Sequence, residues 1–304
     1  MSIKILVAYH KKSPLFKNDI VIPIHAGRAV AKVKSKDGVI SDQDFEWLMK
    51  NMIGDDTGEN ISELNRDLNE WTVLYWAWKN YDKLGNPDYI GLCHYRRFFE
   101  LPVLKHKRFG DYLNKHGYSQ ENFDTIFKKY EFIYGHATPP APQVGFDGWQ
   151  KAVELSQKYH PLLYKEYLNF RKEMKFYCNN MFIMKKEDFF NMCEECFPVA
   201  FDFIKKGQKK VMNLVYPHPS PSLQKAIDEN GGWYPRSTSY MMEYISSFYF
   251  TYLRKKRKSL VLHKKQFAYW PFYKNILALN KEYIQGRKCK ILTVLGLKII
   301  LKRK

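Results

Sequence analysis

The chain has 304 residues, 45% hydrophobic and 16% aromatic, which is enough to bury a substantial core and excludes a disordered chain or a small binding module. Its formal net charge of +19 is unevenly placed: residues 254–304 hold 16 Lys and Arg against one acid, whereas residues 1–253 hold 34 basic and 30 acidic groups. The body is therefore nearly neutral and the C-terminal segment is a polycation. This distribution favours a segment that attaches the protein to an anionic surface over a basic binding groove in the folded body.

Absent motifs exclude several enzyme classes. The sequence contains no GxGxxG, Walker loop, GxSxG or HExxH, so nothing supports a dehydrogenase, a P-loop enzyme, a serine hydrolase or a zincin. The odd number of cysteines, five, in a long chain without a secretory signal favours a reducing cytoplasm.

Hydrophobic periodicity predicts strands that alternate with helices. This order predicts an α/β fold, a mainly parallel sheet flanked by helices, in one catalytic domain over residues 1–255, with a basic helical segment over residues 256–304. We expect strands at residues 3–9, 20–24, 89–93, 131–134 and 177–184, and helices at 42–52, 62–82, 147–175, 187–206 and 238–256, with two short helices in 107–130 and a proline-rich loop at 136–145.

The acidic loop GDDTGENIS, residues 54–62, is the first candidate site. Asp55 and Asp56 can ligate a divalent metal that holds a diphosphate, or accept hydrogen bonds from sugar hydroxyls. An acidic, solvated turn before a helix is the competing interpretation. No apolar strand ends in a clean Asp-x-Asp, so a metal is not required by the pattern.

The segment HYRR, residues 94–97, follows a predicted strand. Arg96 and Arg97 can pair with phosphate oxygens and stabilise the charge that a nucleoside diphosphate gains as it departs. A surface arginine pair is the alternative. His25 and Arg28 follow the second strand, where open α/β sheets place ligand groups.

Two carboxylates are candidates for a general base that removes the proton of an acceptor hydroxyl. Glu243 lies near the start of the last predicted helix, Asp147 begins an earlier one, and the sequence does not rank them. Asn179 and Asn180 place amides at the start of an apolar strand, where sugar hydroxyls are suitable partners.

Four motifs in fixed order give the chain a family resemblance: IPIHAGR (22–28), GDDTGENIS followed by LNEWTVLYWAWKN (68–80), YIGLCHYRRFF (89–99) and NMFIM (180–184). Together they resemble the glycosyltransferase family of capsular and exopolysaccharide biosynthesis first catalogued as a domain of unknown function, over roughly residues 3–253. Its characterised members include galactofuranosyltransferases that use UDP-activated sugars. The resemblance implies a GT-A-like fold and a bacterial hexosyltransferase that uses a UDP-sugar to build capsule, exopolysaccharide or lipopolysaccharide O-antigen. For the reaction itself we expect inversion at the anomeric carbon.

Carried over to this sequence, the resemblance implies a set of residues on the donor side: His25, Gly27, Arg28, Asp55, Asp56, Asn60, Trp76, Lys79, His94, Tyr95, Arg96 and Arg97. In one place the chain departs from the family pattern, because Tyr244 stands where an Arg is expected after Glu243.

The C-terminal segment predicts attachment to a membrane. Residues 291–301 form an apolar run interrupted by Lys298 and flanked by basic residues, too short to span a bilayer but suited to lie in the interface over anionic headgroups. We expect a peripheral protein at the cytoplasmic face of the plasma membrane, acting on a lipid-linked or oligosaccharide acceptor beside other polysaccharide-assembly enzymes. A nucleic-acid-binding protein is the rival class, although no nucleic-acid-binding motif accompanies the basic tail.

Overall fold

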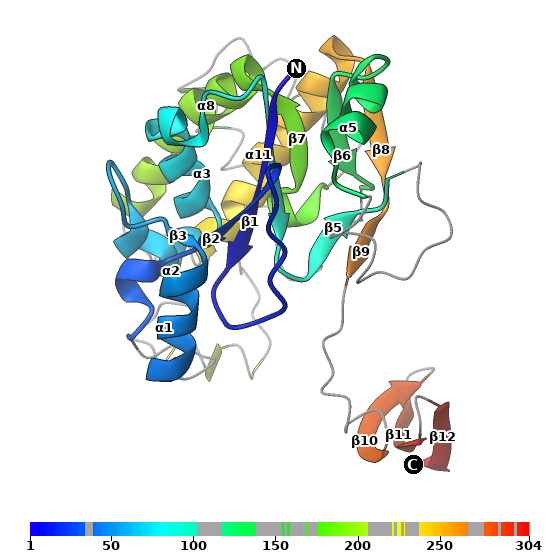
Figure 1. Cartoon of the computed structure of the whole chain (residues 1–304). Helices are drawn as coiled ribbons and strands as arrows, with labels where there is room; N and C mark the ends of the chain where they lie inside the picture. The colour runs from blue at the N-terminus through cyan, green and yellow to red at the C-terminus, as the bar shows by residue number, and fades with distance from the viewer. Residues whose placement is uncertain are drawn as a thin grey trace. The chain divides into compact units, whose positions relative to one another are not determined.

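The computed structural model describes residues 1–33, 39–101, 117–137, 176–205, 237–266, 277–284, 287–294 and 297–303, with single positions inside 154–168 and 221–228. The chain divides into two compact units, Met1–Lys265 and Gln266–Lys304, each described by itself (Figure 1).

Among the described residues, the sheet of the first unit has nine strands, seven of them in the order β3-β2-β1-β4-β7-β6-β8, with β5 beside β4 and β9 beside β5. Pairing is parallel from β3 through β4 and between β6 and β8, and antiparallel at β7. The expected α/β fold with a mostly parallel sheet is confirmed. The strands are β1 (Ile3–Tyr9), β2 (Val21–His25), β3 (Ile53–Gly54), β4 (Tyr89–His94), β5 (Arg97–Phe99), β6 (Phe132–Gly135), β7 (Phe182–Lys185), β8 (Ser259–Leu262) and β9 (Lys264–Gln266).

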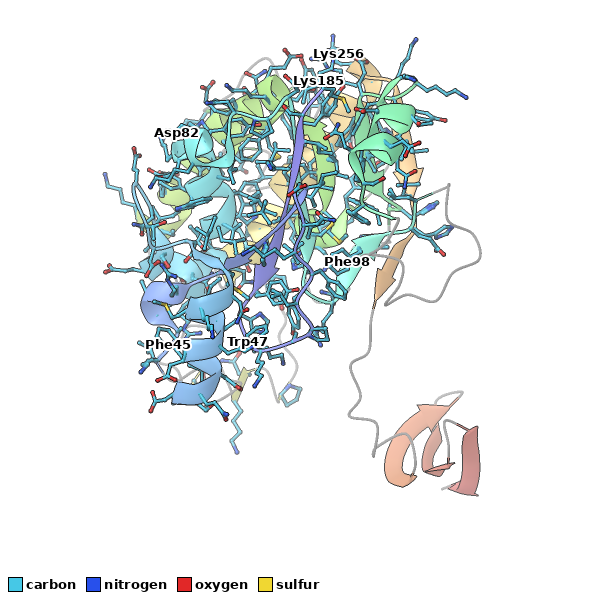
Figure 2. The ribbon with its side chains drawn as sticks, viewed as in Figure 1. Phe45, Trp47, Asp82, Phe98, Lys185 and Lys256 are labelled. Atoms are coloured by element: carbon cyan, nitrogen blue, oxygen red, sulfur yellow. The ribbon has the colours of Figure 1, made fainter. Side chains whose placement is uncertain are left out.

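Helices cover both faces of this sheet, and side chains fill the space between (Figure 2). Alternate residues of a strand point to opposite faces, so Leu6 and Leu92 join the core formed with α3 (Trp71–Lys79), α8 (Lys186–Lys205) and α11 (Ser237–Lys256). On the other face, Tyr89 stacks on Phe127 of α5 (Gln120–Phe127) at 4.0 Å between ring centroids. The helix α1 (Asp42–Asn51) begins after Ser41, whose hydroxyl accepts a bond from the Asp44 amide.

Two predicted elements are interrupted. The helix expected over residues 62–82 is four short pieces: η2 (Ser62–Leu64), α2 (Asn65–Leu68), α3, and η3 (Tyr81–Leu84). Asn69, with φ 50°, breaks it between α2 and α3. The strand expected from residue 177 begins only at Phe182, after the 3-10 turn η6 (Cys178–Asn180), in which Asn179 has φ 72°. Asparagine tolerates positive φ better than most other side chains. Hydrophobic periodicity carries no information on the sign of φ, so it does not predict these two breaks.

The expectation of a helical C-terminal segment is wrong. The second unit contains an antiparallel sheet of β10 (Leu277–Ile284), β11 (Arg287–Val294) and β12 (Leu297–Arg303). Residues 291–301 hold β-branched side chains, such as Ile291 and Thr293, which favour strands. The boundary also moves from residue 255 to Lys265, because β8 and β9 pair into the main sheet.

Among the helices that the structure describes, none combines the length and apolarity needed to cross a membrane.

An ionic network ties α8 to the chain that leaves α11. Asp188 is only 4% exposed, and the Arg257 guanidinium donates to both of its carboxylate oxygens at 3.0 Å and to Glu187 at 2.7 Å. Burial raises the pKa of Asp188, and the hydrogen bond from Arg257 opposes that shift. The buried carboxylate therefore depends on this one guanidinium.

We expect Arg257→Ala to lower the unfolding free energy by about 3–5 kcal/mol, because it leaves Asp188 buried and unpaired. The measurement is chemical denaturation of the full chain. The double variant Arg257→Ala/Asp188→Asn should recover part of the loss, since the uncompensated charge is gone. Equal stability of Arg257→Ala and the wild type would contradict this account.

Candidate donor and catalytic site

Polar residues gather at one edge of the sheet because of the strand directions. The ends of the parallel strands β1, β2 and β4 lie together, with Tyr9 opposite His25 and Ala8 opposite His94. Since β7 runs the other way, its start brings Asn180 to the same edge, and β6 ends there at Gly135. This edge is where open α/β sheets bind ligands.

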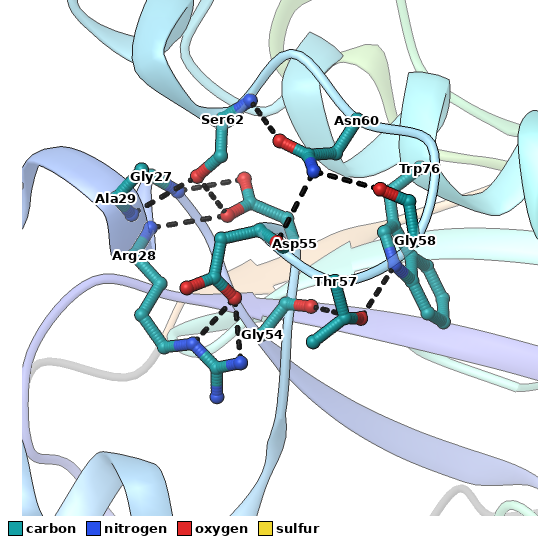
Figure 3. A network of polar contacts seen from close by, with 11 residues as sticks. Gly27, Arg28, Ala29, Gly54, Asp55, Thr57, Gly58, Asn60, Ser62 and Trp76 are labelled. Atoms are coloured by element: carbon teal, nitrogen blue, oxygen red, sulfur yellow. Dashed lines mark hydrogen bonds and ion pairs between the residues drawn. The ribbon is translucent and has the colours of Figure 1, made fainter.

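The Asp55 carboxylate organises the donor-side part of this edge (Figure 3). One oxygen accepts from the Arg28 amide at 3.0 Å and the Ser62 hydroxyl at 2.5 Å, and the other accepts from the Gly27 amide at 2.7 Å and the Thr72 hydroxyl at 2.6 Å. Gly27 has φ 65°, which a glycine adopts without strain and which begins the turn of η1 (Arg28–Val30). Asp55 thus locks the loop after β2 onto the loop after β3.

The remaining residues of the acidic loop brace one another. The Asn60 amide donates to the carbonyls of Asp56 and Gly58 at 3.1 and 2.9 Å, and the buried Trp76 indole donates to Thr57 at 2.9 Å (Figure 3). The Lys79 ammonium lies 3.9 Å from the Trp78 ring centroid and 3.6 Å from Glu59. In this structure the side chains of Asn60, Trp76 and Lys79 therefore shape the loop.

The Asp55 carboxylate is fully engaged by donors of the protein itself. A carboxylate has about four lone-pair positions, and the four donors to Asp55 occupy them. Asp56 is paired with Arg28, whose Nε donates to it at 2.6 Å. Within the part of the chain that the structure describes, no three His, Cys, Asp or Glu side chains form a metal-binding group. Arg28 and Lys79 both place positive charge beside this loop.

HYRR forms the turn between β4 and β5, with His94 paired to Arg97 across the two strands. The Arg96 guanidinium lies 4.9 Å from the Tyr95 ring centroid, and its Nε is buried without a hydrogen-bond partner among the described residues. A buried donor without a partner is costly, so Arg96 offers a hydrogen bond to a ligand. His25, at the end of β2, is fully buried, and both ring nitrogens lack a partner within the described residues. Burial lowers its pKa to about 4, which keeps this ring neutral at pH 7.

A second group of polar residues surrounds Glu243 on α11. The Asn180 amide donates to Glu70 at 2.8 Å and its carbonyl accepts from Ser246 at 2.5 Å. His94 Nε2 lies 2.7 Å from the Asn179 carbonyl. Because a carbonyl only accepts, Nε2 carries the proton. Asn179 and Asn180 thus join β4, α11 and the start of α3, and their partners here are groups of the protein itself.

The carboxyl of Glu243 has an unusual pKa. Burial and, to a lesser degree, the neighbouring Glu70 raise this pKa to about 8, against the opposing effects of the Asn179 backbone amide, Lys264 and Arg97. Burial also lowers the pKa of His94, against the opposing effect of Glu70. A carboxylate tuned toward neutral pH and flanked by cations is suited to accept a proton.

Sequence reasoning missed two residues of this group. Glu70 lies inside the helix expected over residues 62–82 and was not a candidate, and Lys264 lies beyond the expected domain boundary at residue 255. The other candidate base, Asp147, lies outside the described residues, as does most of the proline-rich loop expected at 136–145.

We expect Asp55→Asn to lower the unfolding free energy by about 2–4 kcal/mol, because an amide presents two donors where the site needs four acceptor positions. Thermal unfolding measures the loss. Asp82→Asn, an exposed substitution on η3, is the matched control and should change stability little. Indistinguishable melting of the Asp55 and Asp82 variants would refute the organising role.

Comparisons with known proteins agree with this architecture. A search of curated proteins finds no match. Among solved structures, the chain is similar to the apo structure of WbbM, a bifunctional glycosyltransferase, with a TM-score of 0.64 and 19% identity over 88% of this chain and 46% of that one. The chain thus spans about half the length of that structure, and the likeness establishes the fold. The family model described as Domain of unknown function (DUF4422) matches residues 4–215, and the chain belongs to that family.

Proposed function

We propose that this protein is a glycosyltransferase that moves a sugar from a UDP-sugar to a hydroxyl of a growing capsular, exopolysaccharide or O-antigen glycan. The observation that carries the proposal is Glu243, a carboxyl with its pKa raised to about 8, at the polar edge of a sheet. The fold, similar to that of a bifunctional glycosyltransferase structure, supports the same reaction class.

In the proposed reaction, Glu243 removes the proton of the acceptor hydroxyl, whose oxygen attacks the anomeric carbon with inversion. Arg96 and Arg97 stabilise the charge that develops on UDP as the bond between the sugar and the phosphate breaks. The loop held by Asp55 positions Arg28 on the donor side. We propose galactofuranose or galactose as the transferred sugar. We also propose that the reaction does not require a divalent metal.

The first experiment is ligand-observed NMR with UDP-, GDP-, CMP- and dTDP-linked sugars, with and without EDTA. We expect selective binding of UDP-sugars that survives EDTA, because the arginines replace a metal. Binding that EDTA abolishes would contradict the metal-independent site. Failure of every nucleotide sugar to bind would contradict the transferase and favour a nucleic-acid-binding protein or an inert scaffold.

We expect Glu243→Gln to reduce kcat by about 100-fold or more at unchanged stability, because an amide cannot accept the proton. In the wild type, kcat/KM should rise with pH through about 8 as Glu243 loses its proton. Glu70→Gln removes a charge that raises this pKa but retains an oxygen that accepts from the Asn180 amide. The rise of kcat/KM on the acidic side of the pH profile should therefore move to lower pH. An unmoved limb in Glu70→Gln, or near-normal turnover of Glu243→Gln, would refute the assignment.

We also propose that the second unit holds the protein at the cytoplasmic face of the plasma membrane, near a lipid-linked acceptor and other assembly enzymes. The second unit, residues 266–304, holds nine Lys and Arg against one acid, and each cation near an anionic surface contributes up to about 1 kcal/mol. The structure corrects the form of the segment from helix to sheet and leaves seven of the 16 basic residues of 254–304 in the first unit.

A truncated chain that ends at Gln266 retains all nine strands of the main sheet. We expect it to lose co-sedimentation with vesicles containing anionic lipid while keeping UDP-sugar binding. Neutral vesicles are the control for charge. Unchanged partitioning of the truncated chain would contradict attachment through this unit, and salt-sensitive binding of the full chain to DNA or RNA in place of vesicles would favour the rival class.

A further inference from the structure

Two histidines that the proposed reaction does not use stand at the same edge of the sheet. His136 follows β6 and His263 follows β8, and their exposed rings stack with centroids 4.2 Å apart at an interplanar angle of 30°. Backbone pairing fixes the arrangement, since the His136 amide donates to the Leu262 carbonyl at 3.3 Å and the Glu100 amide donates to the His263 carbonyl at 2.9 Å.

Lys264 adds a cation next to this pair. A Cβ placed on Gly135 would lie 2.6 Å from the Lys264 Cδ, so the lysine stem passes directly over the glycine. The ammonium charge reaches the catalytic group, because it lowers the pKa values of both His94 and Glu243. Gly135 is therefore the position that lets Lys264 extend from β9 into the site.

Stacked imidazoles and an ammonium form a surface suited to an anion. An imidazole ring presents at least one N–H group, and a bound phosphate accepts hydrogen bonds from such groups and from an ammonium. Glu100 directly follows β5, and its backbone amide donates to the His263 carbonyl.

We infer that His136, His263 and Lys264 bind a phosphate or diphosphate group of the acceptor, an inference that rests on the proposed transferase function. The donor phosphates are assigned to Arg28, Arg96 and Arg97, which follow β2 and β4. In the sheet, β1, β4 and β7 lie between β2 and β6, while β5, which begins at Arg97, pairs with both β4 and β9. Adjacent strands are about 4.8 Å apart. An anion at His136 and His263 therefore lies on the opposite side of the site from Arg28. Glu243 lies within reach of both sides, because Lys264 and Arg97 each lower its pKa.

In the test, the full chain is first saturated with UDP. Inorganic pyrophosphate is then titrated in as the probe, and calorimetry measures its affinity. We expect pyrophosphate to bind without displacing UDP, and the double variant His136→Ala/His263→Ala to weaken pyrophosphate at least 10-fold while UDP affinity is unchanged. Gly135→Ala should weaken it as well by displacing Lys264. The exposed pair Lys128→Ala/Lys129→Ala is the matched control for charge and should bind as the wild type does.

Three outcomes would overturn the inference: no binding of pyrophosphate, displacement of UDP by pyrophosphate, or equal affinity in the histidine variant and the wild type. Weakened UDP binding in the histidine variant would reassign the pair to the donor side and overturn it too. If UDP does not bind at all, the proposed function fails, and the same comparison of variants on the free protein still decides the anion site. Thermal melting of each variant separates lost binding from lost folding.

Discussion

Parallel pairing of β1 with β2 and β4 is the constraint on which the site depends. It sets His25 opposite Tyr9 and His94 opposite Ala8, so that loops distant in sequence leave the sheet at one edge. A shift of one residue in either register would turn the alternating core residues toward the wrong face. The apolar side chains that hold the register, such as Leu6 and Leu92, thereby fix the spacing of polar groups that they do not touch.

The two polar groups at this edge, around Asp55 and around Glu243, have different roles. Asp55 is saturated by donors from its own protein and confers rigidity on the loops around it. Burial and the neighbouring Glu70 raise the pKa of Glu243, so that its carboxyl can gain and lose a proton near neutral pH. Saturated carboxylates hold a shape, whereas incompletely compensated ones are suited to chemistry.

Much of the first unit could be predicted from the sequence, because apolar runs such as residues 3–9 and 89–93 are buried strands whose periodicity is strong. The breaks at Asn69 and Asn179 could not, since positive φ at asparagine leaves no periodic signal. HYRR could be placed after a strand, but the hairpin that carries it depends on pairing with β5. Glu70 and Lys264 reach Glu243 through tertiary structure alone, and the C-terminal strands were obscured by a charge pattern equally compatible with a helix.

The central claim is that the donor binds at this polar edge with its phosphates beside the turn after β4. A crystal structure of the protein with UDP tests it most directly. The account predicts diphosphate density next to the guanidinium groups of Arg96 and Arg97, with the Asp55 network intact and no metal between UDP and Asp55. Density for UDP on another face of the sheet, or a metal ion bound by Asp55, would contradict it.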